Sequence, residues 1–265
     1  MKKTLFAALV LASVCACTPR TLTVATYNVG TFHKYTDNST PMVADMMAEI
    51  GAEVLSLNEL DSMTRRRGPV FQLEAFAEEM GRASGTGKWN FNFSRAMAYD
   101  GGAYGIGTAV SPKYKVTGTF DLILPREDGS EQRALSVIET KEFVFASTHL
   151  DHMSSNARCS QAKVITDWMK ERYGDSRKIV ILAGDFNAGP SSDVIAQLRR
   201  DWNIISAQEP SFPSRNPDSC IDYIMVLANK AEYEVEATAV LSSFKSGNAE
   251  DASDHLPTYA RIVLK

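Results

Sequence analysis

Runs of apolar and β-branched residues alternate along this chain with segments in which apolar residues recur at helical spacing. The first run, residues 22–29, predicts a strand whose last residues are polar. Further strands are predicted at residues 54–57, 91–99, 106–111, 115–124, 134–140, 143–148, 179–183, 221–227, 235–241 and 257–264. The helical spacing predicts helices at residues 41–52, 71–80, 158–173 and 192–200. Gly81 and Gly174 directly follow the second and third helices, as is typical of helix ends.

Several predicted strands follow one another without a helix between them, and no glycine-rich phosphate loop opens a helix. This order does not suit a doubly wound parallel sheet. It indicates a layered α/β sandwich, in which two packed sheets have helices on their outer faces. The 265 residues suffice for one large domain, which we expect to span residues 17–265.

The first residues have the features of an export signal. Lys2 and Lys3 precede an apolar run at residues 5–14, and small residues follow it. The sequence Val14-Cys15-Ala16-Cys17 resembles a bacterial lipobox, so we expect residues 1–16 to be a signal peptide and Cys17 to be lipidated. Cleavage by an ordinary signal peptidase and a buried N-terminal helix are the alternatives. The expected location is a bacterial membrane, with the protein anchored by its lipid and facing the periplasm or the exterior.

The charge of the chain favours a small phosphate ligand over extended nucleic acid. The net charge is −4, and removal of residues 1–16 takes away Lys2 and Lys3 and makes it −6. Nucleic-acid binders usually carry an excess of basic residues. The mature chain keeps Cys159 and Cys220, which either form a disulfide or stay unpaired. Nothing in the sequence predicts the oligomeric state.

Polar groups lie at one end of six of the apolar strands. A core strand that ends in a carboxylate, amide or imidazole places that group at the rim of a sheet, where several can converge. These groups are Asn28, Glu59, His149, Asp185 with Asn187, Asp222, and Asp254 with His255.

This set of residues suits metal-assisted hydrolysis of a phosphoester. Mg²⁺, or Mn²⁺ as an alternative, prefers oxygen ligands, which Glu59, Asp254 and Asn28 can supply. Asp185 can orient and activate a water molecule, and Asn187 can hold the phosphate.

The two histidines of the set, His149 and His255, can donate to phosphoryl oxygens or carry a proton. Asp222 can fix the tautomer of one of them. Each motif alone is weak, and the predicted site depends on their joint occurrence.

Six ordered strings resemble the motifs of the endonuclease/exonuclease/phosphatase superfamily, which has the fold of deoxyribonuclease I. They are Thr26-Tyr27-Asn28, Leu57-Asn58-Glu59-Leu60, residues 147–152, Gly184-Asp185-Phe186-Asn187, Ile221-Asp222-Tyr223-Ile224 and Ser253-Asp254-His255-Leu256-Pro257. The resemblance extends from about residue 21 to the C-terminus and implies a four-layered sandwich of two mixed sheets. It also implies that Glu59 holds Mg²⁺ with Asn28 and Asp254 nearby, while Asp185 activates water.

By the same resemblance, His149 and Asn187 contact the phosphate, and His255 paired with Asp222 completes the site. Two positions depart from the family pattern. Asn58 stands where the family usually has Gln, and Ile106 stands where it often has a substrate-contacting Asn.

Four further residues are expected to bind substrate. Arg67 belongs to a run of three arginines shortly after Glu59, and Tyr104 opens the strand segment that resembles a family motif. Arg133 and Arg158 resemble family positions that support the site; for each arginine a solvated or structural role is the alternative.

The sequence therefore predicts a metal-dependent hydrolase, expected to be a phosphodiesterase acting on a small or lipid-linked phosphate. The alternatives are an extracellular nuclease and a binding lipoprotein that performs no catalysis.

Overall fold

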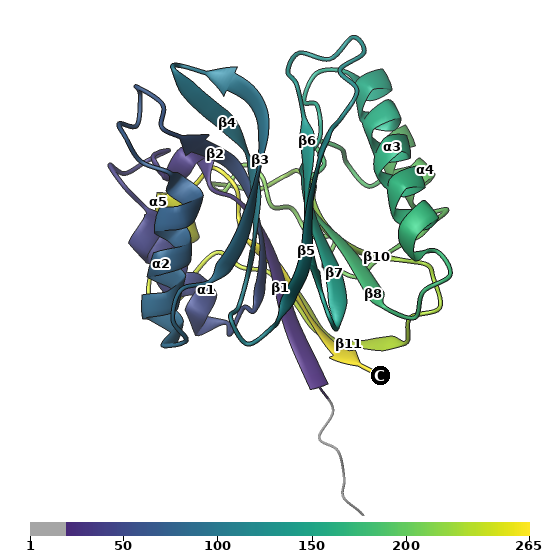
Figure 1. Ribbon diagram of the computed structural model, residues 1–265. Coiled ribbons are helices and arrows are strands. Elements are labelled where there is room, and N and C mark those ends of the chain that lie inside the picture. Colours follow the sequence, from purple (N-terminus) through teal and green to yellow (C-terminus); the bar gives the residue numbers. More distant parts are fainter. Residues whose placement is uncertain (1–19) are drawn as a thin grey trace, which may run out of the picture.

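The computed structural model of this protein describes residues 20–265 (Figure 1). The predicted signal peptide and Cys17 lie outside the described residues. None of the described helices is long and apolar enough to cross a membrane.

The first sheet has six strands in the order β11-β12-β1-β2-β4-β3. The β1–β2 pair is parallel and the other pairs are antiparallel, so the sheet is mixed. Its strands are β1 (Arg20–Asn28), β2 (Val54–Ser62), β3 (Asn90–Tyr99), β4 (Gly102–Val110), β11 (Tyr233–Val240) and β12 (Thr258–Leu264).

The second sheet also has six strands, in the order β5-β6-β7-β8-β10-β9. Here β7 and β8 are the parallel pair, and the other pairs are antiparallel. Its strands are β5 (Val116–Ile123), β6 (Ala134–Thr140), β7 (Phe143–His149), β8 (Ile179–Asp185), β9 (Trp202–Ile204) and β10 (Asp222–Leu227).

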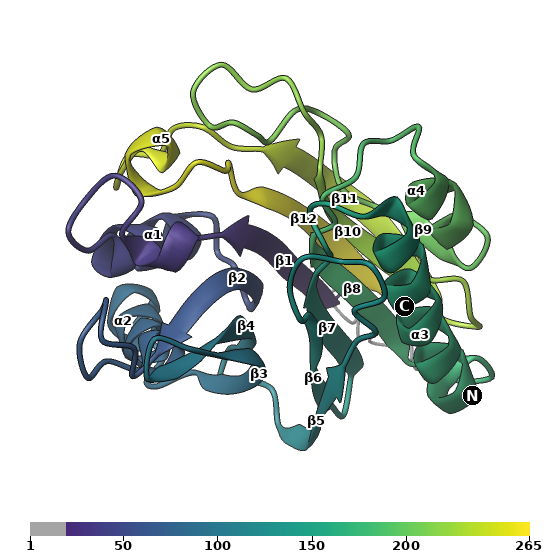
Figure 2. The same cartoon turned by 90° about the horizontal axis from the view of Figure 1, so that it is seen from above.

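Helices cover the outer face of each sheet, which gives the four layers that the sequence predicts (Figures 1 and 2). The first sheet carries α1 (Thr40–Glu49), α2 (Gln72–Ser84) and the short α5 (Ala249–Ala252). The second sheet carries α3 (Ser155–Tyr173) and α4 (Asp193–Leu198). A 3₁₀ turn, η1 (Gly30–Phe32), follows β1.

The alternation of side chains along β1 shows how the layers form. Leu22 and Val24 belong to the apolar cluster between the two sheets, whereas Ala25 and Tyr27 belong to the cluster beneath α1 and α2. Successive strand residues point to opposite faces, so a strand that is buried on both faces reads as a nearly continuous apolar run.

The interface between the sheets becomes polar toward the end of β1. Ser56 of β2 and Ser147 of β7 share a hydrogen bond of 2.7 Å across the interface, and both side chains are fully buried. The apolar packing thus gives way to cross-sheet hydrogen bonds as the strands approach the edge where the candidate site lies.

Each strand and helix predicted from the sequence is present, with differences at the ends. β2 continues to Ser62 and β4 begins at Gly102, so both are longer than predicted. The strand β9, the turn η1 and the helix α5 were not predicted, because three or four residues are too few to show a period.

Candidate active site

The topology of both sheets brings the predicted site residues to one edge. β1 and β2 are parallel and end there, while β12 is antiparallel to β1 and begins there. In the second sheet β7 and β8 end at this edge and the antiparallel β10 begins at it. The residues delivered in this way are Asn28, Glu59, His149, Asp185, Asp222 and His255.

Glu59 reaches the site through a bulge in β2. The pairing of β2 with β4 shifts by one residue between Leu57 and Leu60. Within this bulge Glu59 has a φ of 60°, in the left-handed region that a side chain other than Gly rarely adopts. Such a conformation costs roughly 1–3 kcal/mol and persists where the surroundings impose it. The bulge turns the carboxylate toward the site.

Asn58, the residue before Glu59, fastens the first sheet to the second. Its Nδ2 donates to the carbonyl of Thr148 at 2.9 Å, and its Oδ1 accepts from the backbone N–H of Asp185 at 3.0 Å. Asn58 thereby fixes the ends of β7 and β8, which carry His149 and Asp185. This departure from the family pattern leaves the joint between the sheets intact.

Asp185 lies at the centre of the site. Its Oδ2 accepts from Nδ2 of Asn28 at 3.1 Å and lies 3.4 Å from Nε2 of His149 and 3.6 Å from Nε2 of His255. Burial raises the pKa of Asp185 to about 7, and the nearby Asp222 adds to this, while the charge of His255 opposes it. A carboxyl with such a pKa is suited to take up and release a proton near neutral pH.

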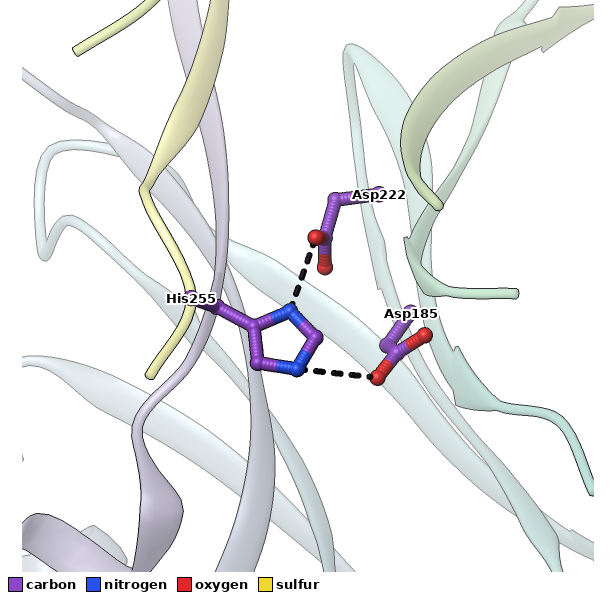
Figure 3. A group of neighbouring side chains, drawn as sticks. All are labelled: Asp185, Asp222 and His255. Carbon is purple, nitrogen blue, oxygen red and sulfur yellow. Dashed lines mark hydrogen bonds and ion pairs between the residues drawn. The ribbon is translucent and has the colours of Figure 1, made fainter. Parts of the chain in front are cut away.

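His255 is held between two carboxylates (Figure 3). Its Nδ1 donates to Oδ2 of Asp222 at 2.9 Å. Burial favours the neutral ring, but the charges of Asp222 and Asp185 outweigh it and raise the pKa of His255 to about 10. The ring is therefore an imidazolium that presents Nε2–H to Asp185.

His149 has the opposite character. Nη1 of the buried Arg133 lies 3.1 Å from His149 Nδ1. Burial and the charge of Arg133 hold the pKa of His149 well below its usual range. A guanidinium can only donate, so Nδ1 of the neutral ring accepts and Nε2 carries the hydrogen.

Asn187 holds the Asp185 carboxylate through its backbone N–H group. Its backbone N–H donates to Oδ1 of Asp185 at 2.8 Å, and its Nδ2 donates to the carbonyl of Leu150 at 3.0 Å. Asn187 has a φ of 49°, a conformation that Asn tolerates better than most residues. One hydrogen of its amino group remains for a ligand.

Asn28 turns its amino group, and not its oxygen, toward Glu59. Its Oδ1 accepts from the backbone N–H of Gly30 at 3.2 Å, which fixes the orientation of the amide. Its Nδ2 consequently donates to Oε1 of Glu59 at 3.0 Å. In this arrangement Asn28 orients the Glu59 carboxylate, whereas the sequence predicts that Asn28 supplies an oxygen ligand.

The carboxylate oxygens around Glu59 are suitable ligands for a hard divalent cation. Among the described residues, Asn28 alone donates a hydrogen bond to the Glu59 carboxylate. Most acceptor positions of the Glu59 carboxylate therefore remain open. Asp254 supplies a second carboxylate, whose Oδ2 forms an ion pair with Nζ of Lys34 at 2.6 Å. Burial disfavours the ammonium, but Asp254 and Glu59 outweigh this and raise the pKa of Lys34. Two carboxylates that attract an ammonium are suitable ligands for Mg²⁺.

A second group of potential ligands consists of Asp185, Asp222 and His255, whose ligand atoms lie within 4.8 Å of one another. Such a group can hold a metal ion when the imidazole offers a lone pair. An imidazolium has none. The charges of Asp222 and Asp185 favour the protonated ring, so a metal ion here would have to displace a proton from His255, whereas the carboxylates of Glu59 and Asp254 can bind a metal directly.

Two of the predicted substrate-binding residues line a pocket beside Glu59, and a third lies within the site. Arg67 and Tyr104 form part of the wall of this pocket, which has a volume of about 270 Å³. Arg133 contacts His149, as described above. Arg158 donates to the carbonyl of Asp151 at 2.9 Å and is not part of the pocket wall.

Three residues that sequence reasoning did not identify complete the support of His255 and Asn28. Ser211 donates to Oδ2 of Asp222 at 2.6 Å, and the ring of Phe212 lies 4.8 Å from that of His255. Ser253 donates to the carbonyl of Asn28 at 2.6 Å. Ser253 stood within a recognised string, whereas Ser211 and Phe212 lie in a loop without periodicity.

Cys159 and Cys220 are both free thiols in the structure. Of the two alternatives left open by the sequence, the unpaired one is observed. Both side chains pack with the apolar cluster beneath α3 and α4.

Comparison with known proteins identifies the family. The model of the endonuclease/exonuclease/phosphatase family matches residues 25–255. The chain belongs to this family. Endonucleases, exonucleases and phosphatases all cleave phosphoester bonds, so the resemblance seen in the sequence is confirmed and the chain is a member of a group of phosphoester hydrolases.

Solved structures share the fold of this family member at low sequence identity. A family protein from Bacteroides thetaiotaomicron is 19% identical with a TM-score of 0.70, covering 94% of this chain and 100% of its own. A mannosyl-6-phosphatase from the same organism is 20% identical with a TM-score of 0.71, covering 92% and 100%. The human Nocturnin catalytic domain with bound sulfate is 18% identical with a TM-score of 0.67, covering 92% and 95%. No curated protein sequence matches this chain significantly.

Proposed function

We propose that this protein is a metal-dependent hydrolase that cleaves the phosphoester bond of a small substrate. The observation that carries the proposal is the arrangement around Oδ2 of Asp185. A neutral His149, an imidazolium of His255 and the amide of Asn28 all present N–H groups to this oxygen, within 3.1–3.6 Å. Hydrolysis needs such donors to stabilise the phosphoryl oxygens and a base to accept a proton from water.

Each residue then has a role that follows from its protonation. Asp185 accepts a proton from the attacking water as the oxygen of that water bonds to phosphorus. His149 donates Nε2–H to a phosphoryl oxygen throughout, because Arg133 keeps its Nδ1 an acceptor. His255 donates from Nε2, and Asp222 stabilises its charge. The oxygen of the leaving alcohol departs with the electrons of the broken P–O bond and takes up a proton from solvent water, while Asp185 releases the proton it accepted to solvent.

The divalent ion belongs beside Glu59 and Asp254 in this proposal. When bound there, it neutralises charge on the phosphoryl group and acidifies a bound water. Asn28 contributes by holding the Glu59 carboxylate, to which it donates at 3.0 Å.

A small substrate is favoured over a nucleic acid by two observations. The pocket beside Glu59 has a volume of about 270 Å³, just below the roughly 300–1,000 Å³ typical of small-molecule sites. The net charge of the chain is −4, and a nucleic-acid surface usually needs a basic excess. The shared fold with a mannosyl-6-phosphatase is compatible with a phosphomonoester. We also propose the alternative that the protein is a phosphodiesterase acting on a small or lipid-linked phosphodiester.

A substrate panel tests this function and separates its forms. The protein lacking residues 1–17 is supplied with Mg²⁺ or Mn²⁺ and tested on p-nitrophenyl phosphate, bis(p-nitrophenyl) phosphate, sugar phosphates, glycerophosphodiesters and plasmid DNA. We expect turnover of a small phosphoester that EDTA abolishes and that Asp185→Asn lowers by at least a hundredfold. Plasmid cleavage alone would favour the nuclease. Absence of turnover on the whole panel would leave a binding protein as the better description.

We also propose that the protein is exported and anchored by a lipid on Cys17, on the basis of the lipobox-like sequence alone. Labelling with a fatty-acid analogue in a bacterial host should mark the chain, and Cys17→Ser should remove the label. A labelled Cys17→Ser variant would contradict the assignment.

A further inference from the structure

The pocket beside Glu59 extends away from the groups assigned to the reaction. Its wall comes from the turn after β1, the end of β2 and the segment after it, strands β3 and β4, and Glu131 in the segment between β5 and β6. Glu59 lines it, whereas Asp185, His149 and His255 do not. A substrate whose phosphoryl group lies between Glu59 and Asp185 therefore has room for its organic part in this pocket, toward the β4–β3 edge of the first sheet.

Three cations line the pocket, and two of them already have a carboxylate partner. Lys34 pairs with Asp254 at 2.6 Å. Arg66 donates to both oxygens of the fully buried Asp61, from Nε at 2.6 Å and from Nη2 at 2.8 Å. Bidentate bonding of this kind neutralises the Arg66 guanidinium and fixes its plane.

Arg67 differs from both neighbours because its partner is a neutral hydroxyl. Its Nε and Nη2 donate to Oγ1 of Thr31 at 3.2 and 2.9 Å. No carboxylate of the described residues lies within ion-pair distance of it. Burial and the charge of Arg66 lower the pKa of Arg67, and the charge of Asp61, which is already paired with Arg66, opposes this only in part.

Thr31 is itself held in place, so Arg67 is pre-oriented. Thr31 has a φ of 58° within the η1 turn, and its carbonyl accepts from Nε2 of Gln72 at 2.5 Å. The two N–H groups that bond Thr31 lie on one side of the Arg67 guanidinium. Its Nη1 and the second hydrogen of Nη2 remain for a ligand.

Another part of the pocket wall is formed by the rings of Tyr99 and Tyr104, and Glu131, which also lines the pocket, pairs with Arg133 at 3.2 Å. Arg66 lies over the ring of Tyr99, 4.3 Å from its centroid, and the rings of Tyr99 and Tyr104 are 6.1 Å apart. Burial and the charge of Glu59 raise the pKa of Tyr104, so its phenol stays protonated. A neutral phenol next to apolar ring faces suits a polyol chain, which offers both C–H and O–H groups.

We propose that this pocket binds an organic group bearing a second anion, which Arg67 holds with its free N–H groups. The substrate class is then a polyol phosphoester with a further phosphate or carboxylate, such as a sugar bisphosphate or a phosphorylated sugar acid. This inference rests on the proposed function, because it places the scissile phosphoryl group beside Glu59.

The test compares ligands that differ by the second anion. With Mg²⁺, kcat/KM is measured for fructose 1,6-bisphosphate against fructose 6-phosphate, and for 6-phosphogluconate against glucose 6-phosphate. The same ligands are titrated calorimetrically in EDTA, where no hydrolysis takes place. We expect at least one doubly anionic ligand to be preferred by about tenfold or more, as a bidentate charged contact provides. The pair that shows the preference identifies the anion as phosphate or carboxylate.

Arg67→Ala should bring that preference close to one in both measurements, and Thr31→Val should reduce it in part. Arg65→Ala is the matched control, because Arg65 bonds Asp100 and does not line the pocket. Circular dichroism melting checks that each variant folds. Equal kcat/KM and equal affinity of the wild type for both ligands of each pair would overturn the inference. A preference that survives Arg67→Ala, or an equal loss on both members, would also overturn it.

The two proposals fail in different ways. Hydrolysis without discrimination by Arg67 removes the pocket assignment and leaves the proposed function. Binding that depends on Arg67 without any hydrolysis removes the proposed function and leaves the pocket.

Discussion

Nη1 of Arg133 lies 3.1 Å from Nδ1 of His149, and both side chains are buried. Because the guanidinium only donates, this contact decides which nitrogen of His149 carries the hydrogen. Burial of the ring and, after it, the positive charge of Arg133 hold the pKa of His149 well below its usual range, so the ring is neutral. Arg133 is thus a positioning residue that makes His149 a permanent donor at Nε2.

Arg133→Met should release His149 from this constraint. The ring would lose its fixed tautomer, and its pKa would move up toward its usual range because the adjacent positive charge is gone. We expect kcat to fall by roughly 10²-fold or more, the scale of a lost acid–base group. Nitrogen NMR of the histidines should show Nε2–H in the wild type and a tautomer mixture in the variant. Arg95→Met, at an exposed position of β3, is the control. An unchanged tautomer would contradict the role assigned to Arg133.

His255 should make the folded protein less stable as the pH rises from about 6.5 to about 10. Its pKa is raised to about 10 in the folded protein and is about 6.5 when unfolded. The folded state therefore binds the extra proton, and this stabilisation is complete below pH 6.5 and is lost as pH rises to 10. In EDTA, the wild type should lose several degrees of melting temperature relative to His255→Gln across this interval. Parallel melting curves for the two proteins would show that the imidazolium is not stabilised by Asp222 and Asp185.

Much of the site could be predicted because its residues end apolar strands. Asn28, His149 and Asp185 each follow a run buried on both faces, and such an abrupt change of polarity is visible in sequence. Parallel strands then deliver these residues to a common edge, which explains why they converge. The fold class follows from the same strand and helix order.

What the sequence does not reveal depends on register and on local backbone geometry. The contact of Arg133 with His149 depends on how β6 pairs with β7, where Leu135 lies opposite Thr148. The bulge at Glu59 has no glycine to mark it. The orientation of the Asn28 amide depends on a single backbone N–H, that of Gly30.

Asp151 should control stability at acid pH. Its carboxylate accepts from the backbone N–H groups of Met153 at 2.9 Å, Ser154 at 2.8 Å and Ser130 at 2.8 Å. Burial opposes the charge, but these hydrogen bonds outweigh it and lower the pKa of Asp151 to about 2. Because the pKa of Asp151 is lower in the folded protein, its carboxylate stabilises the fold at pH values above its unfolded pKa, which is near 4. This stabilisation is lost as the pH falls toward 2.

Asp151→Asn should therefore lower the free energy of unfolding at pH 7 by about 2 kcal/mol, from about 1.4 kcal/mol per pKa unit. Urea denaturation at pH 7 and pH 2 measures this, and the difference between the two proteins should shrink at the lower pH. Asp175→Asn is the control, because the Asp175 side chain is fully exposed. A difference that is the same at both pH values would mean that the charge of Asp151 has no part in it.

Lys34 should compete with a divalent ion for Asp254. Its Nζ lies 2.6 Å from Oδ2 of Asp254, and Asp254 together with Glu59 raises its pKa. Lys34→Met removes this ammonium, so Mg²⁺ should bind a few-fold more tightly, while Glu59→Gln should abolish binding. Calorimetric titration with MgCl₂ measures both effects without any substrate. Lys88→Met, which breaks an ion pair with Glu74 on the α2 side of the first sheet, should leave the affinity unchanged. Weaker Mg²⁺ binding in Lys34→Met would mean that the ammonium supports the metal site, and unaffected binding in Glu59→Gln would place the ion elsewhere.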